Sequence, residues 1–301
     1  MEESKEKYNE SEAYKSHFVT KANTRAIKDA MPSEHAIDKA LRKEALEKAP
    51  ENYPLISCIM PTANRYKFVF ESINSFLRQD YPNKELIIVF DQPSDLPAIQ
   101  FPANVKLIQT KNIILGAKRN EACSYASGTI IAHWDDDDIY NTNRLSVQAK
   151  PIIEGKADIT GLQNFVYLEL PAGKGWMPKE SLHSEVYVCN VHGGTLVYNR
   201  WVWEQIGIFP HYKMGEDTAF LRKAVVRRVR LMPLPGYFSI VYVRHTSNTS
   251  RLKENNFTLS PDWTPTIVPE WAQEQTVRHM NMTMNQPIMA PFVNANKQMR
   301  I

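Results

Sequence analysis

Apolar runs alternate with amphipathic stretches between about residues 54 and 134. Four runs read as buried strands that end in polar turns: Leu55–Met60, Leu86–Phe90, Val105–Ile108 and Thr129–Trp134. Helical spacing of apolar residues after the first run predicts one helix, carried by Val69, Ile73, Phe76 and Leu77. A second helix is predicted over residues 117–126, stopped by Ser127-Gly128. This alternation of strands and helices predicts βαβ units in a mainly parallel sheet.

The pattern becomes less regular beyond about residue 150. Strands are predicted over residues 163–170, 184–189, 195–198 and 237–243, and Phe220, Leu221, Ala224 and Val225 mark one face of a helix. The first two of these strands are joined by a Pro/Gly turn at residues 171–175. From about Pro261 the chain is rich in Pro, Asn and Met, which predicts an irregular C-terminal tail.

The first 50 residues differ from the rest of the chain. They are rich in Lys, Glu and Ala, and Ile37, Leu41 and Ala45 recur at four-residue spacing. This spacing predicts a modestly amphipathic helical arm. Such an arm could cover the main domain, form a homo-oligomer contact or be partly disordered.

The composition bounds the class of protein. The chain has 301 residues, 43% of them hydrophobic, and a formal net charge of +3, so it can bury a large core and its charge balance does not demand nucleic acid. It has no apolar stretch long enough to span a bilayer and its charged N-terminus lacks the apolar core of a signal peptide. Its three cysteines show neither zinc nor disulfide spacing. These features predict a cytoplasmic protein.

Four consecutive acids, Asp135–Asp138, directly follow the fourth predicted strand. Adjacent carboxylates repel one another unless a positive charge lies among them, and Mg²⁺ or Mn²⁺ suits carboxylate oxygens and phosphate. A solvated acidic loop is the alternative explanation. Asn64 and Asp91 also follow predicted strands. Because ligands of open α/β sheets bind beyond the carboxyl ends of the strands, these residues predict a metal held against a diphosphate.

Four segments, in order, resemble family 2 of the nucleotide-sugar glycosyltransferases. The segments are Ile59–Arg65, Leu86–Asp91, Leu115–Ala122 leading into Trp134 and the aspartates, and Ile206–Pro210 followed by Gly215-Glu216-Asp217. The resemblance runs from about Pro54 to Arg251. It departs from the family in two places: Phe90 replaces the first of two acids, and the loop that follows is Gln92-Pro93-Ser94.

This resemblance implies an α/β protein of the GT-A fold, with a Rossmann-like, mainly parallel sheet and helices on both faces. The predicted domains are the helical arm over 1–50, a glycosyltransferase domain over 51–255 that the resemblance implies, and a C-terminal extension over 256–301; the family core explains neither the arm nor the extension. Within the central domain, residues 51–150 form the nucleotide-binding half and residues 151–255 the acceptor half.

The resemblance also implies an inverting transfer of a sugar from a nucleoside-diphosphate sugar, most commonly a UDP-sugar, to an acceptor hydroxyl. Asp137 and Asp135 are then the metal ligands, and Asp136 faces the ribose. Asp138 bonds the following turn at Tyr140-Asn141. Asp217 is the general base with Glu216 beside it, although acids in the first turn of a helix also complement its dipole.

The remaining site residues surround the donor in the family. The predicted nucleotide and phosphate contacts are Thr62, Asn64, Arg65, Asp91, Lys118, Arg119, Asp135, Asp136 and Arg251. His245 is a predicted third metal ligand. Each of these roles has a structural alternative. Thr62, Asn64 and Asp91 could serve only to form turns, and Arg119 could simply balance the charge of the aspartates. A lone histidine such as His245 is often structural.

Some questions stay open at this level. The resemblance implies that residues 192–195 precede the segment that borders the acceptor pocket, and core packing is the favoured role of Trp201 and Trp203. The acceptor could be a glycan, a lipid-linked sugar, a protein, a metabolite or a modified nucleic-acid base. Clustered arginines at 227, 228 and 230 permit an anionic acceptor or a peripheral membrane contact. Two other functions are possible alternatives. One is a sugar nucleotidyltransferase, but the turn after Met60 lacks the glycines typical of that class. The other is a sugar-nucleotide-binding scaffold without catalysis.

Overall fold

The computed structural model describes residues 53–180, 187–245, 248 and 262–283. The predicted arm over 1–50 and the predicted phosphate contact Arg251 lie outside these ranges. Within the described ranges, no helix is both long enough and apolar enough to cross a membrane.

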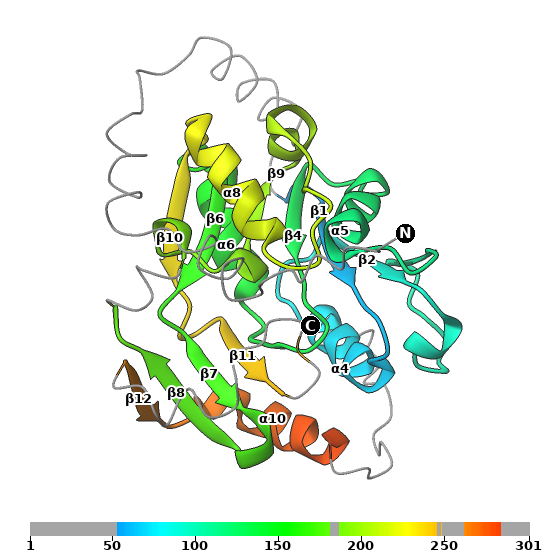
Figure 1. Cartoon of the computed structure of the whole chain (residues 1–301), viewed down its shortest axis with the longest axis vertical. Helices are drawn as coiled ribbons and strands as arrows, with labels where there is room; N and C mark the ends of the chain where they lie inside the picture. The colour runs from blue at the N-terminus through cyan, green and yellow to red at the C-terminus, as the bar shows by residue number, and fades with distance from the viewer. Residues whose placement is uncertain (1–52, 181–186, 246–247, 249–261, 284–301) are drawn as a thin grey trace, which may run out of the picture.

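A seven-stranded sheet forms the centre of the molecule, in the order β10-β6-β9-β4-β1-β2-β3 (Figure 1). Its strands are β1 (Ile56–Pro61), β2 (Lys84–Phe90), β3 (Val105–Gln109), β4 (Ile130–His133), β6 (Ile159–Gln163), β9 (Val197–Asn199) and β10 (Leu231–Pro235). Only β9 runs antiparallel to its neighbours β4 and β6. The prediction of a mainly parallel sheet is therefore confirmed, and the carboxyl ends of β1, β2 and β4 lie at one edge.

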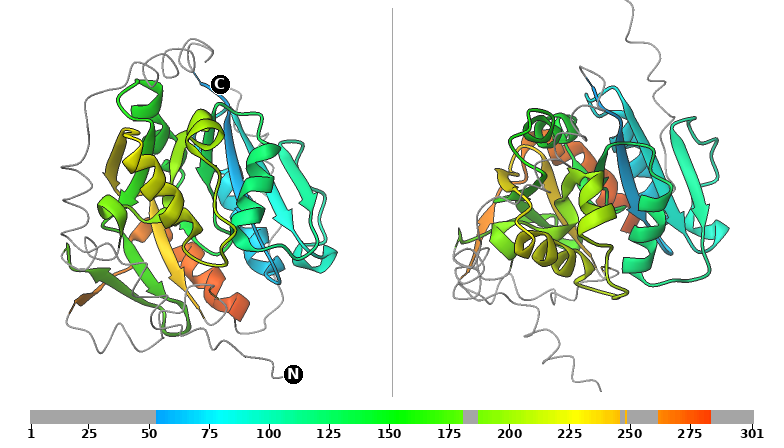
Figure 2. Two further views of the ribbon diagram at one scale, coloured as in Figure 1. Left: turned by 45° about the horizontal axis from the view of Figure 1, so that its top comes forward. Right: turned by 90° about the horizontal axis from the view of Figure 1, so that it is seen from above.

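Helices cover both faces of this sheet, as Figure 2 shows. On one face α4 (Tyr66–Leu77) and α6 (Arg144–Ile153) pack on alternate residues of β1, among them Cys58 and Met60. On the other face α5 (Leu115–Ser124) and α8 (Glu216–Val226) enclose Ile59. Burial on both faces explains why β1, β2 and β4 read as continuous apolar runs.

A second sheet of five strands lies beside the first, in the order β12-β8-β7-β11-β5. It contains β5 (Ile139–Tyr140), β7 (Val166–Glu169), β8 (Lys174–Pro178), β11 (Ile240–Arg244) and β12 (Trp263–Thr266). Single helical turns occur at η1 (Pro93–Asp95), η2 (Leu170–Ala172), η3 (Val188–Asn190), η4 (Gly193–Thr195) and the π-helix η5 (Val202–Ile206). Trp201 and Trp203 pack in or against the core, as predicted.

Three predictions about this half are wrong. The predicted strand over 163–170 is too long: β7 covers only Val166–Glu169, and Gln163 ends β6 in the other sheet, because Asn164 takes a left-handed φ of 54° and redirects the chain. The described end of the predicted strand over 184–189 is a helical turn, and β8 is the strand that pairs with β7. The tail is not irregular over its described residues, since it forms β12 and the helix α10 (Glu270–Thr283).

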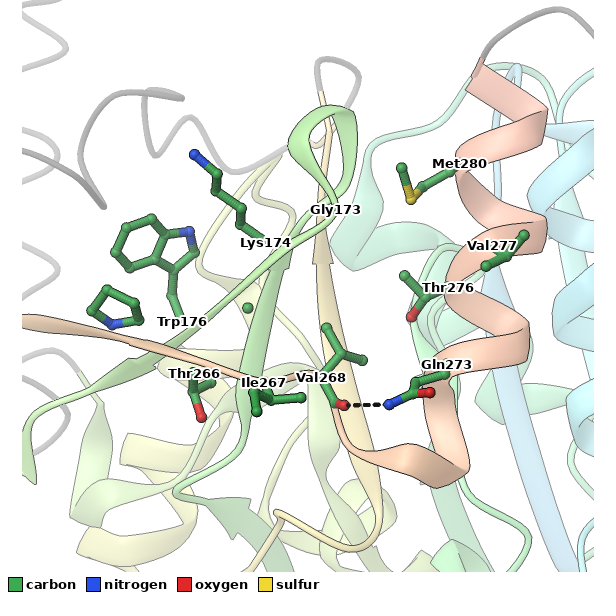
Figure 3. Close-up of a pocket in the computed structure, with 12 residues that line it drawn as sticks. Gly173, Lys174, Trp176, Thr266, Ile267, Val268, Gln273, Thr276, Val277 and Met280 are labelled. Carbon is green, nitrogen blue, oxygen red and sulfur yellow. Dashed lines mark hydrogen bonds between the residues drawn. The ribbon is translucent and has the colours of Figure 1, made fainter.

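Helix α10 packs against α4 and the second sheet. Lys67 Nζ donates to the carbonyl of Met282 at 3.3 Å, and Arg278 lies 3.7 Å from the buried carboxylate of Glu71. On its other side α10 and the turn before β8 border a hollow of about 710 Å³. In Figure 3 Met280 of α10 faces the turn at Gly173, and the side-chain amide of Gln273 donates to Val268 O at 3.5 Å. The hollow contains none of the predicted site residues.

Candidate active site

The acid run occupies the short connection between β4 and β5, at the carboxyl edge of the central sheet. The amide of Trp134 bonds to Ile59 O at 3.0 Å, which holds the start of the connection beside β1. Asp138 Oδ1 accepts from the amide of Val243 in β11 at 2.9 Å. The prediction that Asp138 bonds the turn at Tyr140-Asn141 is therefore wrong, because the second sheet approaches closely enough to supply the donor.

Asp136 and Asp137 are paired with residues that follow β1. The hydroxyl of Thr62 donates to Asp136 Oδ2 at 2.6 Å. The guanidinium of Arg65 donates to Asp136 Oδ1 at 2.9 Å and to Asp137 Oδ2 at 2.8 Å. A single arginine thus neutralises part of the repulsion between the two buried carboxylates.

Asp137 also receives donors from the end of the second sheet. His245 Nε2 lies 3.1 Å and Asn248 Nδ2 lies 3.0 Å from Asp137 Oδ2. The His245 ring stacks on Phe68 of α4, with ring centroids 4.7 Å apart. The buried ring of His279 on α10 contacts the same Phe68 at 5.6 Å. Helix α10 therefore forms part of the wall behind this side of the site.

The remaining predicted nucleotide residues gather at the ends of β1 and β2. Lys118 Nζ donates to Asp91 Oδ2 at 2.6 Å and to Thr62 O at 2.8 Å. Asn64 has a left-handed φ of 57°, and its amide donates to Asp95 Oδ1 at 2.8 Å. Asp95 thus fixes the turn after β1, and Lys118 joins the ends of the two strands.

Arg119 connects the acid run to the start of α8. Its Nη2 donates to Asp135 Oδ1 at 3.1 Å and its Nε donates to Glu216 Oε1 at 2.9 Å. Burial, together with the negative charge of Asp217, raises the pKa of Glu216 to about 7 in spite of Arg119. The arginine therefore lies between the predicted metal ligand and the predicted base pair, Glu216 and Asp217.

Asp217 and Asp135 both lie against the glycine turn Gly193-Gly194. A Cβ placed on Gly193 would lie 2.2 Å from Asp217 Oδ2, and one on Gly194 would lie 2.7 Å from Asp135 Oδ2. His133 Nδ1 donates to Gly193 O at 2.8 Å and holds this turn beside β4. Two acids from distant parts of the chain therefore border the same few backbone atoms.

The four aspartates differ in their acidity. Burial raises the pKa of Asp136 to about 6, although Arg65 opposes the shift. Burial also acts on Asp137, but Arg65 and His245 outweigh it and lower the pKa of that carboxyl to about 2. The pKa values of Asp135 and Asp138 are raised, again by burial first. Asp137 is accordingly the member of the run that is most firmly ionised.

These residues define how a divalent cation could be held. Within the described ranges, no three side chains of His, Cys, Asp or Glu surround a common point. Asp135 and Asp137 nevertheless offer carboxylate oxygens, and His245 offers an imidazole nitrogen beside Asp137. Such a donor set suits a cation that takes one or two carboxylates and completes its coordination with substrate phosphates.

Several residues of the site were not singled out from the sequence. They are Phe68, Ser72, Asp95, Tyr140, Arg144 and Asn248. Asn248 lies three residues after His245, a spacing that could have drawn attention to it. The others carry no signal in the hydrophobic pattern, because their contacts depend on how the chain turns and packs.

Comparisons with known proteins bear on the family and the fold of this chain. The family model described as Glycosyl transferase family 2 matches residues 57–215, more than half of the chain. One similar protein is the UDP-Glc:alpha-D-GlcNAc-diphosphoundecaprenol beta-1,3-glucosyltransferase WfgD of Escherichia coli, 38% identical over 33% of this chain and 42% of WfgD. Another is the poly(ribitol-phosphate) beta-N-acetylglucosaminyltransferase TarS of Staphylococcus aureus, 31% identical over 34% of this chain and 20% of TarS. The matches thus span less than half the length of these curated relatives.

The fold has a counterpart among solved structures. The crystal structure of S. aureus TarS residues 1–349 in complex with UDP-GlcNAc matches 64% of this chain and 60% of that chain, with 23% sequence identity and a TM-score of 0.50. This likeness concerns the fold, and it agrees with the predicted GT-A architecture. With the family match over residues 57–215, it follows that this chain belongs to glycosyl transferase family 2.

Proposed function

We propose that this chain is an inverting, metal-dependent glycosyltransferase that moves a sugar from a nucleoside-diphosphate sugar to an acceptor hydroxyl. The observation that carries the proposal is the shared position of Asp135 and Asp217 at the Gly193-Gly194 turn. Asp135 belongs to the acid run on the donor side, whereas Asp217 lies 82 residues later in the chain, at the start of α8. The absence of side chains on both glycines lets the two carboxylates lie against the same turn.

Asp217 is the proposed general base. Its Oδ2 borders Gly193, while its Oδ1 accepts from the amide of Thr218 at 2.6 Å. An acid fixed by one oxygen and open at the other can accept the proton that the acceptor hydroxyl loses as it attacks the anomeric carbon. A single base on the side opposite the leaving group accounts for inversion, since no covalent intermediate is required.

Asp135 and Asp137, with His245, are the proposed ligands of Mn²⁺ or Mg²⁺. When bound, the cation would act as a Lewis acid that stabilises the charge on the departing diphosphate. Neighbouring side chains set the charge and the orientation of these proposed ligands. Arg65 and His245 keep Asp137 ionised, and Arg119 orients Asp135.

The nucleoside is proposed to bind at the ends of β1 and β2. Asp91 lies there with Lys118, and Asp136 is held against Thr62. The name of the relative WfgD specifies UDP-glucose as donor, and this supports a UDP-sugar for the present chain. The acceptor follows from neither the site nor the names, because the matches cover only part of each relative.

Nucleotide binding and transfer test the proposal separately. The first experiment is a thermal-shift panel of UDP, GDP, dTDP and CDP, each with Mn²⁺, Mg²⁺ or EDTA. We expect UDP to stabilise the chain only in the presence of a cation, by about 2.7 kcal/mol at a hundredfold excess over Kd. Release of UDP from UDP-sugars then measures turnover, and Asp217→Asn should abolish turnover while leaving the thermal shift intact. A chain that no nucleotide stabilises would contradict the proposal.

A further inference from the structure

The hydroxyl of Tyr140 makes two hydrogen bonds to the backbone of a single residue, Asp135. The amide of Asp135 donates to Tyr140 Oη at 2.8 Å, and Tyr140 Oη donates to Asp135 O at 3.1 Å. Ser72 Oγ donates to the same carbonyl at the longer distance of 3.3 Å. Among the described residues, the amide of Asp135 therefore depends on the tyrosine hydroxyl alone for its acceptor.

The tyrosine itself is held rigidly. Its ring is fully buried and lies on the guanidinium of Arg144, whose Cζ is 4.4 Å from the ring centroid. Arg144 also contacts the ring of Trp134 at 5.1 Å and donates to His133 O at 2.6 Å. Tyr140 is in addition part of β5, which pairs with β11 through Ile240. The hydroxyl is thus fixed by both sheets.

The side chain of Asp135 in turn contacts other residues of the site. Its Oδ1 accepts a hydrogen bond from Arg119, which also donates to Glu216, the neighbour of Asp217. Its Oδ2 borders Gly194. A shift in the backbone of Asp135 would therefore move one proposed metal ligand. It would also displace the buried side chain of Arg119, which connects Asp135 to the first turn of α8.

We propose that Tyr140 is a positioning residue that fixes Asp135 for metal and donor binding through its hydroxyl. This inference rests on the function proposed above. Tyr140 does not face the substrate. It acts by satisfying the amide of Asp135 in the buried connection between β4 and β5, where an unpaired amide is costly.

The test compares Tyr140→Phe with a matched control, Tyr81→Phe. Both tyrosines are buried, and the hydroxyl of Tyr81 donates to a backbone carbonyl, that of Pro54, at 2.6 Å. Phenylalanine keeps the ring in each case, so the stacking of Arg144 and the packing of the core are retained. Both variants lose one buried hydroxyl, but only the first loses a contact with the acid run.

We expect Tyr140→Phe to raise the KM for the donor and the half-saturating Mn²⁺ concentration about tenfold, with a smaller change in kcat. Tyr81→Phe should lower Tm to a similar extent and leave both constants unchanged. Equal constants in the parent and Tyr140→Phe would overturn the inference. If Tyr140→Phe does not fold, Ser72→Ala, which removes the weaker contact to Asp135 O, should shift both constants in the same direction by a smaller factor, and no shift would overturn it.

Hydrogen exchange separates this inference from the proposed function. The Asp135 amide should exchange faster in Tyr140→Phe than in the parent, and at the parental rate in Tyr81→Phe. If the parent neither binds a nucleotide nor transfers a sugar, the proposed function fails, and the exchange rate still decides whether Tyr140 holds Asp135. An unchanged exchange rate would overturn the positioning role in either case.

Discussion

The carboxylates on the donor side form salt bridges with basic side chains, whereas the carboxylate of Asp217 forms none within the described part of the chain. Asp136 and Asp137 share Arg65, and Asp91 pairs with Lys118 at 2.6 Å. The hydrogen bonds of Asp217 come from the adjacent Thr218. An acid that must stay ionised to hold cations benefits from such partners, whereas a direct cation partner would make a base less able to take a proton. The difference in pairing thus matches the difference in proposed role.

Removing the base should give the largest effect. We expect Asp217→Asn to lower kcat by about 10³-fold, because the amide cannot accept the acceptor's proton. The KM for the donor should remain near the parental value, since Asp217 does not belong to the paired donor acids. Steady-state kinetics with a UDP-sugar checks this, and Glu204→Gln on the distant surface serves as control. Parental kcat in Asp217→Asn would remove Asp217 from the mechanism.

Neutralising the most strongly ionised donor acid should have the next largest effect. Asp137→Asn removes the charge that Arg65, His245 and Asn248 all face. We expect the cation-dependent stabilisation by UDP, about 2.7 kcal/mol at a hundredfold excess over Kd, to disappear. The thermal shift measured with and without EDTA checks this loss, and Glu204→Gln should keep the full shift. A variant that still responds to Mn²⁺ would place the cation elsewhere.

The raised pKa of Glu216 predicts a pH dependence of stability. The folded chain keeps this proton up to about pH 7, whereas the ordinary pKa of a glutamate side chain is 4.5. The folded state then binds more protons in this window, so the free energy of unfolding falls as pH rises from about 4.5 to about 7. Glu216→Gln should remove roughly 3 kcal/mol of this decline.

Urea unfolding at a series of pH values measures the effect of Glu216→Gln. The difference in unfolding free energy between variant and parent should grow in favour of the variant as the pH rises. The lowered pKa of Asp137, about 2, acts in the opposite sense, and the stability it contributes is lost only as pH falls below about 4. Parallel pH profiles for the parent and Glu216→Gln would show that Glu216 ionises normally.

The smallest predicted effects come from the two adjacent glycines. Neither Gly193 nor Gly194 has a positive φ, so alanine tests the available space and not the backbone conformation. Gly193→Ala should displace Asp217 and lower kcat about tenfold, whereas Gly194→Ala should displace Asp135 and raise the donor KM by a similar factor. Kinetics on the pair checks this contrast. The same signature in both variants would mean that the two acids do not act separately.

The sequence by itself determined the part of the central sheet formed by β1 to β4 and the acids at its edge, but it did not predict β6 or β10. The continuous apolar strands β1, β2 and β4 and the helices between them were predicted to within a few residues, because burial on both faces leaves a local pattern. The position of Asn64, Asp91 and Asp135–Asp138 at strand ends followed from the same pattern. The resemblance supplied the family, which the family model bears out.

Only the tertiary structure decided how these residues are paired. Arg119 meets Glu216 across 97 residues, and His245 meets Asp137 across 108. In the second sheet β7 and β11 overlap predicted strands, whereas β5, β8 and β12 were missed, as was α10. Tyr140 gave no signal of its role because its contact with Asp135 depends on the bend between β4 and β5. Hydrophobic periodicity reports which face of an element is buried, but it carries no information about which polar groups meet once the elements have packed.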